Sequence, residues 1–134
     1  MTMDVRALTV RFLEWFNSLW AREASVTAEE AQSYVAQTIR FSLNGRLIAD
    51  GVEAYAARID GLRRQCRSLR IEFPVAEMVV EGSHVAVRFF ETLVYDDGSV
   101  HDMVDGAFIQ FDDHGKIAAF HDVFSGGDPV RTMR

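Results

Sequence analysis

Short polar turns divide the second half of the chain into four segments that are rich in β-branched and aromatic residues. Each turn combines a glycine with acidic or small polar residues, which favour tight connections. Connections this short join neighbouring antiparallel strands, so the pattern predicts a four-stranded antiparallel meander. Pro74 has no N–H to donate, so its strand should lie at an edge or contain a bulge. The predicted strands cover residues 71–81, 85–95, 99–111 and 117–124.

The first half of the chain has the periodicity of helices. Apolar residues recur every three or four positions over residues 4–22, which predicts an amphipathic helix. Thr27, with a glutamate three residues later, is typical of a capping box and should begin a short second helix. Alternation over 38–43 predicts a short strand, and Asp50 resembles the cap of a third helix that runs to about residue 68. Helices first and an antiparallel sheet last indicate an α+β domain.

The size of the chain predicts one domain. Its 134 residues, 49% of them hydrophobic, fit a single compact unit with a sizeable core. We find no internal repeat, low-complexity stretch or linker. The prediction is therefore a single domain over residues 1–134, with a core over about 5–125 and a short C-terminal tail.

Charge and composition exclude several classes of protein. The net charge of −6 argues against nucleic acid as the main partner, because phosphate binding needs a basic surface. No window approaches the roughly 18 apolar residues of a membrane span, and the N-terminal residues lack the pattern of a secretory signal. Cys66 is the only cysteine, so no internal disulfide can form and we expect a cytoplasmic protein.

The order of the predicted elements and the last three segments resemble a known superfamily. The segments are Phe-Ile-Gln-Phe at 108–111, Gly-Lys-Ile at 115–117 and Phe-His-Asp-Val-Phe-Ser at 120–125. With the order α-α-β-α-β-β-β-β, they resemble the nuclear transport factor two-like superfamily, and within it the SnoaL-like polyketide cyclases and their relatives, the ketosteroid isomerases and limonene epoxide hydrolases. The resemblance implies a cone-shaped, curved antiparallel sheet wrapped around three helices, with an apolar pocket open at one end.

The resemblance also suggests which side chains face the pocket. It puts Phe120, Asp122 and Phe124 inward, and the same alternation puts Asp105 inward, opposite Asp122. Arg88 and Phe90 share a face of the preceding strand and should lie near Asp105. The aromatic residues of the first half that are expected in the wall of the pocket are Trp15, Tyr34, Phe41 and Tyr55.

One guanidinium and two carboxylates in an apolar pocket would support acid–base chemistry. Two close carboxylates cannot both ionise cheaply, so the pKa of one rises while the arginine lowers the pKa of the other. In this hypothesis Asp122 shuttles the proton, Asp105 raises its pKa, and Arg88 orients it and stabilises an oxyanion. The alternative is that Arg88 forms a buried ion pair with Asp105 or Asp122, which neutralises itself and only fixes the register of the strands.

The resemblance also allows the functional residues of two related enzyme families to be compared with this chain. Ketosteroid isomerase chemistry is unlike this chain, because Phe12, Ala107 and either Phe41 or Ser42 occupy the positions of its functional groups. For epoxide hydrolysis, Arg88 and Asp122 align with two members of an Asp-Arg-Asp set. The third member falls on Phe90, and the water-holding tyrosine and asparagine fall on Arg40 and Ser42.

The remaining hypothesis is a cofactor-free lyase, cyclase or isomerase for a small, apolar, cyclic or carbonyl-bearing molecule. Its rival is a non-catalytic ligand-binding or protein-interaction module of the same fold. We expect no metal site, because His101 and His121 each precede an aspartate that points to the opposite face, and no phosphate loop, because Gly126 and Gly127 open no helix.

The outer face of the sheet is expected to carry large apolar side chains. A homodimer through this face would bury them, as the resemblance also implies. The residues expected there are Phe89, Leu93, Tyr95 and Phe108.

Overall fold

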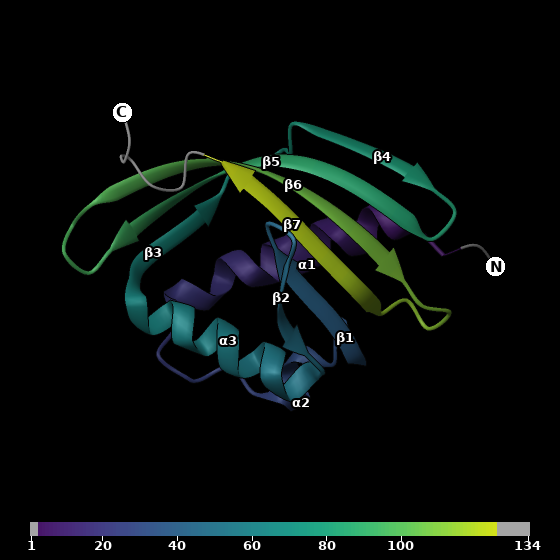
Figure 1. Ribbon diagram of the computed structural model, residues 1–134, viewed down its shortest axis with the longest axis horizontal. Helices are drawn as coiled ribbons and strands as arrows, with labels where there is room; N and C mark the ends of the chain where they lie inside the picture. The colour runs from purple at the N-terminus through teal and green to yellow at the C-terminus, as the bar shows by residue number, and fades with distance from the viewer. Residues whose placement is uncertain (1–2, 126–134) are drawn as a thin grey trace.

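The computed structural model describes residues 3–125, which form a curled sheet with helices against its concave side (Figure 1). The predicted C-terminal tail, including Gly126 and Gly127, lies outside the described residues. Within residues 3–125 no helix is long and apolar enough to cross a membrane.

The helices follow the predicted periodicity closely. Helix α1 (Val5–Ser18) continues into a 3-10 turn at Leu19–Ala21, α2 (Ala28–Ala31) is one short turn, and α3 spans Val52–Gln65. Thr27 caps α2 as expected, since its hydroxyl accepts the N–H of Glu30. The prediction of Asp50 as the cap of α3 is wrong. Gly51 holds that place, at a φ of 99° that favours glycine.

The strands are more numerous than predicted. The segment 71–81 is divided, because Pro74 lies between two edge strands that both pair with the next strand. An unpredicted strand after the Asn44–Gly45 turn pairs back on the first. The strands are β1 (Val35–Leu43), β2 (Arg46–Asp50), β3 (Cys66–Ile71), β4 (Glu77–Glu81), β5 (His84–Tyr95), β6 (Val100–Phe111) and β7 (Ile117–Ser125).

The predicted meander is present from β4 to β7, and each of its steps is antiparallel. The sheet as a whole is mixed, with the order β2-β1-β7-β6-β5-β3 and β4 beside β5. Strand β1 runs parallel to β7, which lies more than 70 residues further along the chain. No local sequence pattern indicates the parallel pairing of β1 with β7. The expectation of a purely antiparallel sheet was therefore wrong for this one pair of strands.

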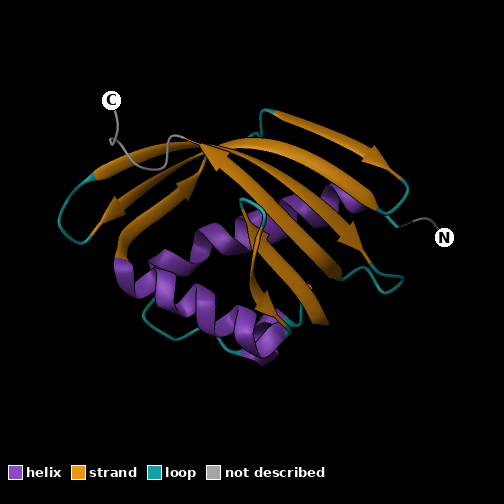
Figure 2. Ribbon diagram, in the orientation of Figure 1, coloured by secondary structure: helices purple, strands orange, loops and turns teal. Residues whose placement is uncertain are grey.

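The sheet curls over the helices and forms the α+β cone that the sequence predicts (Figure 2). Alternate residues of β6 are buried along its whole length, so one face of the strand packs inward. Phe12 and Leu13 of α1 and Ile59 of α3 supply apolar side chains on the concave side. On the convex side no helix of the described chain covers the sheet.

The register of β5 differs from the prediction by one residue. Phe89, not Phe90, is the partner of Asp105. Because successive side chains point to opposite faces, a shift of one residue exchanges the inner and outer sets of a strand. Phe89 and Leu93 are consequently buried instead of outward, while Phe90 is exposed.

The outer face is therefore composed differently from the prediction. Tyr95, expected there, lines the inner side, and Phe108 is on the outer face as predicted, with 57% of its surface exposed. The other large apolar side chains exposed on β4 to β7 are Val79, Phe90, Val100, Val104 and Val123.

Arg63 holds α3 to the segment that leads from α1 to α2. Its guanidinium donates to the carbonyl oxygens of Leu19 at 2.9 Å, Arg22 at 2.7 Å and Ala24 at 2.8 Å. It also forms an ion pair with Asp60 at 3.0 Å, and only 10% of its side chain is exposed. One side chain thus satisfies three carbonyl groups of an irregular segment, which otherwise have no partner in a helix or strand.

We expect Arg63→Ala to lower the free energy of unfolding by about 2 to 4 kcal/mol, because it removes the donor to these three carbonyls and one of the partners of Asp60. Arg64 is the matched control, since its side chain is 71% exposed and pairs only with Asp60. Arg64→Ala should cost less than about 1 kcal/mol. Urea unfolding followed by circular dichroism measures both values, and equal losses for the two variants would contradict the role of Arg63.

Candidate functional site

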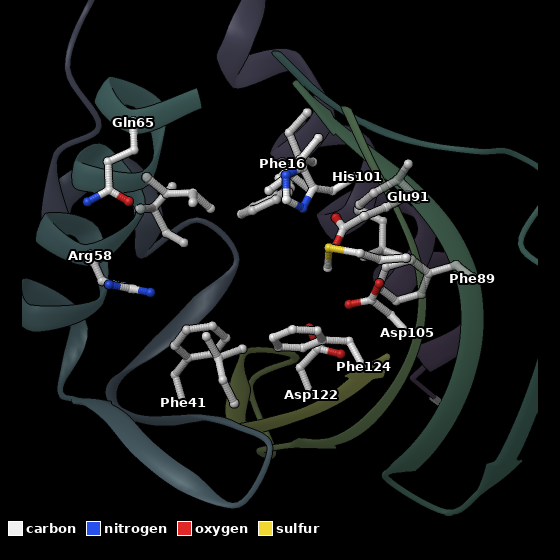
Figure 3. A pocket seen from close by; sticks show the side chains of 18 of the residues that line it. Phe16, Phe41, Arg58, Gln65, Phe89, Glu91, His101, Asp105, Asp122 and Phe124 are labelled. Carbon is white, nitrogen blue, oxygen red and sulfur yellow. The ribbon is translucent and has the colours of Figure 1, made fainter. Parts of the chain in front are cut away.

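The concave side of the sheet and the helices α1 and α3 enclose a cavity of about 890 Å³ (Figure 3). This volume lies in the range of pockets that hold small organic molecules. Most of the wall is apolar. The aromatic side chains that line it are Phe12, Phe16, Phe41, Tyr55, Phe89, Tyr95, Phe120 and Phe124.

Neighbouring strands each place one acid in this wall. Glu91 comes from β5, Asp105 from β6 and Asp122 from β7, and all three occupy buried positions of the alternating pattern. Their exposed fractions are 7%, 1% and 9%. We refer to Glu91, Asp105 and Asp122 as the acidic cluster.

The strand registers bring the acids together along a diagonal. Glu91 pairs with Met103, two residues before Asp105, and Asp122 pairs with Ala107, two residues after it. Diagonal neighbours on one face of a sheet lie within reach of long side chains. Asp105 accordingly lies within hydrogen-bonding reach of both other acids and forms the middle of the cluster.

Burial raises the pKa of each acid in the cluster above its ordinary value. Desolvation is the main cause for all three, because the cavity wall offers little water to a charged carboxylate. The neighbouring acids act in both directions. The hydrogen bond to Asp105 lowers the pKa of Glu91 and the charge of Asp122 raises it, with a result of about 7, whereas Asp105 raises the pKa of Asp122. The cluster therefore holds protons at neutral pH.

Several oxygens of the cluster receive no hydrogen bond from the rest of the described chain. Both carboxyl oxygens of Asp105 and Oδ1 of Asp122 are buried, and no N–H or O–H from residues 3–125 reaches them. Two ionised carboxylates cannot hydrogen bond to each other, but a proton on one makes it a donor to its neighbour. The cluster can therefore supply hydrogen-bond donors to itself by sharing protons. A bound ligand is a second source of such donors.

Other polar groups lie around the cavity. Figure 3 shows Arg58 and Gln65 of α3 on the side opposite the acidic cluster. His101 of β6 is 6% exposed, lines the cavity and packs edge-on against Tyr95 at 4.6 Å. The phenol of Tyr55 also lines the wall, and burial raises its pKa.

Six of the side chains predicted for the site lie in the cavity wall. Asp105 and Asp122 belong to the acidic cluster, and four aromatic residues line the rest of the wall: Phe41, Tyr55, Phe120 and Phe124. The predicted register between β6 and β7 differs from the structure by two residues, since Asp105 pairs with Phe124 instead of Asp122. The turn accounts for one residue, because Phe111 pairs with Ile117 and not with Lys116, and a bulge between Gln110 and Phe111 accounts for the other. A shift of two leaves both acids on the inner face.

The expectation that Arg88 and Phe90 face the pocket is wrong. Both lie on the convex face, where the Arg88 guanidinium pairs with Glu77 at 3.2 Å and lies 5.8 Å from the ring centre of Phe90. The one-residue difference in the register of β5 explains both errors. The triad of one arginine and two aspartates, predicted as a site or as a buried ion pair, is therefore not formed.

Trp15 and Tyr34 also lie outside the cavity lining. Their rings stack on each other at 4.7 Å, and the indole N–H of Trp15 donates to Glu30 at 2.8 Å. They belong to the packing between α1, α2 and the sheet, the ordinary role of aromatic residues at helical spacing.

Glu91 is the functional residue that the sequence reasoning missed. The signal was present in the turn at Asp96, Asp97 and Gly98. A three-residue connection pairs Tyr95 with Ser99, whose carbonyl accepts the N–H of Tyr95 at 2.9 Å. If the pairing continues from Tyr95 and Ser99 one residue at a time, Phe89 lies opposite Asp105. Glu91, two residues after Phe89, then lies on the same inner face.

The outward position predicted for His121 is confirmed, and its Nδ1 lies 2.6 Å from the hydroxyl of Ser42. His101 is buried in the cavity wall, with 6% of its surface exposed. Among residues 3–125 no group of His, Cys, Asp or Glu has an arrangement that could hold a metal ion.

Comparison with solved structures identifies the fold. A SnoaL-like polyketide cyclase from Agrobacterium tumefaciens is 18% identical, with a TM-score of 0.72 over 97% of this chain and 98% of that one. An NTF2-like protein of unknown function from Exiguobacterium is 19% identical, with a TM-score of 0.74 over 88% and 98%. An LEH-like epoxide hydrolase from M. tuberculosis is 12% identical, with a TM-score of 0.74 over 95% and 86%.

These similarities confirm the fold that the resemblance implied: the chain has the nuclear transport factor 2-like fold that SnoaL-like proteins share. No family model and no curated protein matches the chain. A fold of this kind hosts many activities, so the function has to be argued from the cavity itself.

The raised pKa values make stability depend on pH. The folded protein keeps protons on the acidic cluster at pH values where the unfolded chain has lost them, so folding takes up protons. The free energy of unfolding should therefore fall between about pH 5 and pH 9, by up to about 1.4 kcal/mol per pH unit for each retained proton.

Asp105→Asn should flatten this decline, because it removes one of the titrating groups. Urea unfolding at several pH values measures the slope. Asp102→Asn, an exposed change on the same strand, is the control and should keep the wild-type slope. An unchanged slope in Asp105→Asn would contradict the assignment.

Proposed function

We propose that the protein is a cofactor-free acid–base enzyme of the lyase, cyclase or isomerase type, acting on a small, cyclic or carbonyl-bearing molecule. The observation that carries this proposal is the acidic cluster, three adjacent carboxyl groups in an otherwise apolar cavity. A cluster that holds protons at neutral pH contains a general acid and a general base side by side.

Within the cluster, Asp122 is the proton shuttle. It lines the cavity beside the aromatic rings of Phe120 and Phe124, where an apolar substrate would lie. Asp105 is the partner that raises its pKa, and Glu91 extends the chain of carboxyls by one more proton site. The oxyanion role predicted for Arg88 passes to a protonated carboxyl, which can donate a hydrogen bond to a developing charge.

Deuterium exchange tests the acid–base step without knowledge of the natural substrate. We expect the protein to exchange the C–H hydrogens beside the carbonyl of 1-indanone, 2-tetralone or 2-cyclohexen-1-one in D₂O faster than buffer does, measured by NMR. Asp122→Asn should slow the exchange by about 100-fold or more, the usual contribution of one acid–base group. Asp102→Asn is the control and should exchange like the wild type.

The rival function, a non-catalytic binding module, predicts a different result. It would be supported if a ketone bound in a thermal-shift assay without any accelerated exchange, or if Asp122→Asn exchanged as fast as the wild type.

We also propose that two copies of the chain associate through the convex face of the sheet. Phe90 pairs with Val104, and Val123 and Phe108 lie on the neighbouring positions of β6 and β7, so the exposed apolar side chains adjoin one another. An apolar surface of this kind is typical of an interface.

Sedimentation tests the dimer. The wild type should sediment at twice the mass of the 15.1 kDa chain, and Phe108→Asp should shift it towards the single chain, because it places a charge in the apolar contact. Ala54→Asp adds the same charge to the exposed side of α3 and should leave the mass unchanged. A wild type that sediments only as a single chain would contradict the proposal.

A further inference from the structure

The cavity is lined by far more acidic than basic side chains. Among the lining residues of the described chain the single arginine is Arg58, and the acids are Glu91, Asp96, Asp97, Asp105 and Asp122. The ion pairs among residues 3–125 are all formed elsewhere, so no arginine or lysine of this range pairs with the acidic cluster. A buried carboxylate that ionises is normally paired with a cation, and residues 3–125 supply none to these acids.

The unpaired oxygens face the space where a ligand would lie. Figure 3 shows the carboxyl groups of Asp105 and Asp122 directed into the cavity. Both side chains are at least nine-tenths buried, and three of their oxygens lack a donor from residues 3–125. A protonated amine supplies what is missing, because it carries positive charge and several N–H donors on one atom.

The rest of the wall also suits a cation. The aromatic rings around the acidic cluster include Phe41, Phe89, Phe120 and Phe124. The face of an aromatic ring attracts a cation, and the attraction grows where water is excluded. The apolar part of a ligand would fill the remaining volume against the same rings.

Arg58 does not reverse this preference. It lies across the cavity from the acidic cluster on α3, and its side chain is exposed, so water screens its charge. An anionic ligand at Arg58 would have to share the cavity with five acids. A neutral ligand would bring no charge to stabilise the ionised form of the acids.

We propose that the ligand of this cavity is an organic cation, a protonated amine on an apolar ring or chain, held by Glu91, Asp105 and Asp122. This inference takes the position of the ligand from the proposed function, and it adds that the ligand is positively charged. It holds whether or not a reaction follows.

Binding of a cation should release protons from the acidic cluster. An ammonium group beside the carboxyls favours their ionised form and lowers their pKa towards the ordinary value. The other titratable or charged groups that face the cavity are Tyr55 and Arg58 of α3, Tyr95 of β5, His101 of β6 and the turn residues Asp96 and Asp97. Of these, His101 alone has an ordinary pKa near neutrality, so His101→Gln is needed to assign the released protons.

Three probes of equal shape and different charge test the inference. They are 1-naphthylmethylamine, 1-naphthalenemethanol and 1-naphthoate, each titrated into the whole chain at pH 7.5 by calorimetry. The amine should bind about tenfold or more tighter than the alcohol, and the carboxylate should bind most weakly. Repeating the amine titration in buffers of different ionisation enthalpy should show net proton release, which the alcohol should not produce.

Variants test whether the acidic cluster causes the preference for the amine and the proton release. Glu91→Gln and Asp105→Asn should each reduce the preference for the amine over the alcohol and reduce the proton release. Asp102→Asn, outside the cavity, should keep both. His101→Gln changes the cavity wall, so only its proton release is compared, and that release should persist because it comes from the acidic cluster. Because the three-probe comparison uses the wild type, it does not depend on whether the cluster variants fold.

The inference is overturned if the alcohol binds as tightly as the amine, if 1-naphthoate binds tightest, or if the amine does not bind. Its failure is distinguishable from failure of the proposed enzyme. Ketone exchange without a preference for the amine would overturn only the present inference. A preference for the amine with proton release, but without ketone exchange, would contradict catalysis and support the cationic ligand.

Discussion

The two-residue alternation of three adjacent strands is the constraint on which the cavity depends. Strand β6 buries every second residue, β5 does so from Val85 to Leu93 and β7 from Phe120 to Asp122, and each strand has one acid within its buried set. Because the strands are neighbours in the sheet, these acids meet in a position where water cannot solvate them fully. Burial of carboxyl groups without a cation costs stability, and retained protons limit that cost.

The helices determine that this acidic wall faces a cavity and not a solid core. Helix α3 lies against the sheet, and Arg63 fastens it to the segment before α2 through three hydrogen bonds. The side chains that α3 directs towards the sheet include Tyr55 and Ile59, which form the wall but leave about 890 Å³ open. A polar cluster that has no cationic partner among residues 3–125, at the side of such a space, is well placed to interact with a ligand. On the convex side no helix of the described chain covers the sheet, so its apolar side chains stay exposed.

The sequence predicted the fold well because its signals are local. Turn residues, helical periodicity and the cap at Thr27 report on a few neighbouring positions, and the structure agrees with each of them. The acids of β6 and β7 were also placed on the correct face, although their register was two residues in error, because an even shift preserves the face. The one-residue error on β5 had the opposite effect: it put Arg88 in the predicted site and kept Glu91 out of it. The parallel pairing of β1 with β7 was not predictable, since it joins segments on either side of α3 and the meander.

The sequence by itself determined the elements, the turns between them and the alternation of each strand, because these depend on neighbours a few residues apart. Only the tertiary structure decided which of the two faces of β5 turns inward and that Glu91, Asp105 and Asp122 become neighbours. The physical reason is that the period of a strand is a property of its own backbone. The choice between its faces depends instead on register and on packing against helices that are distant in the chain.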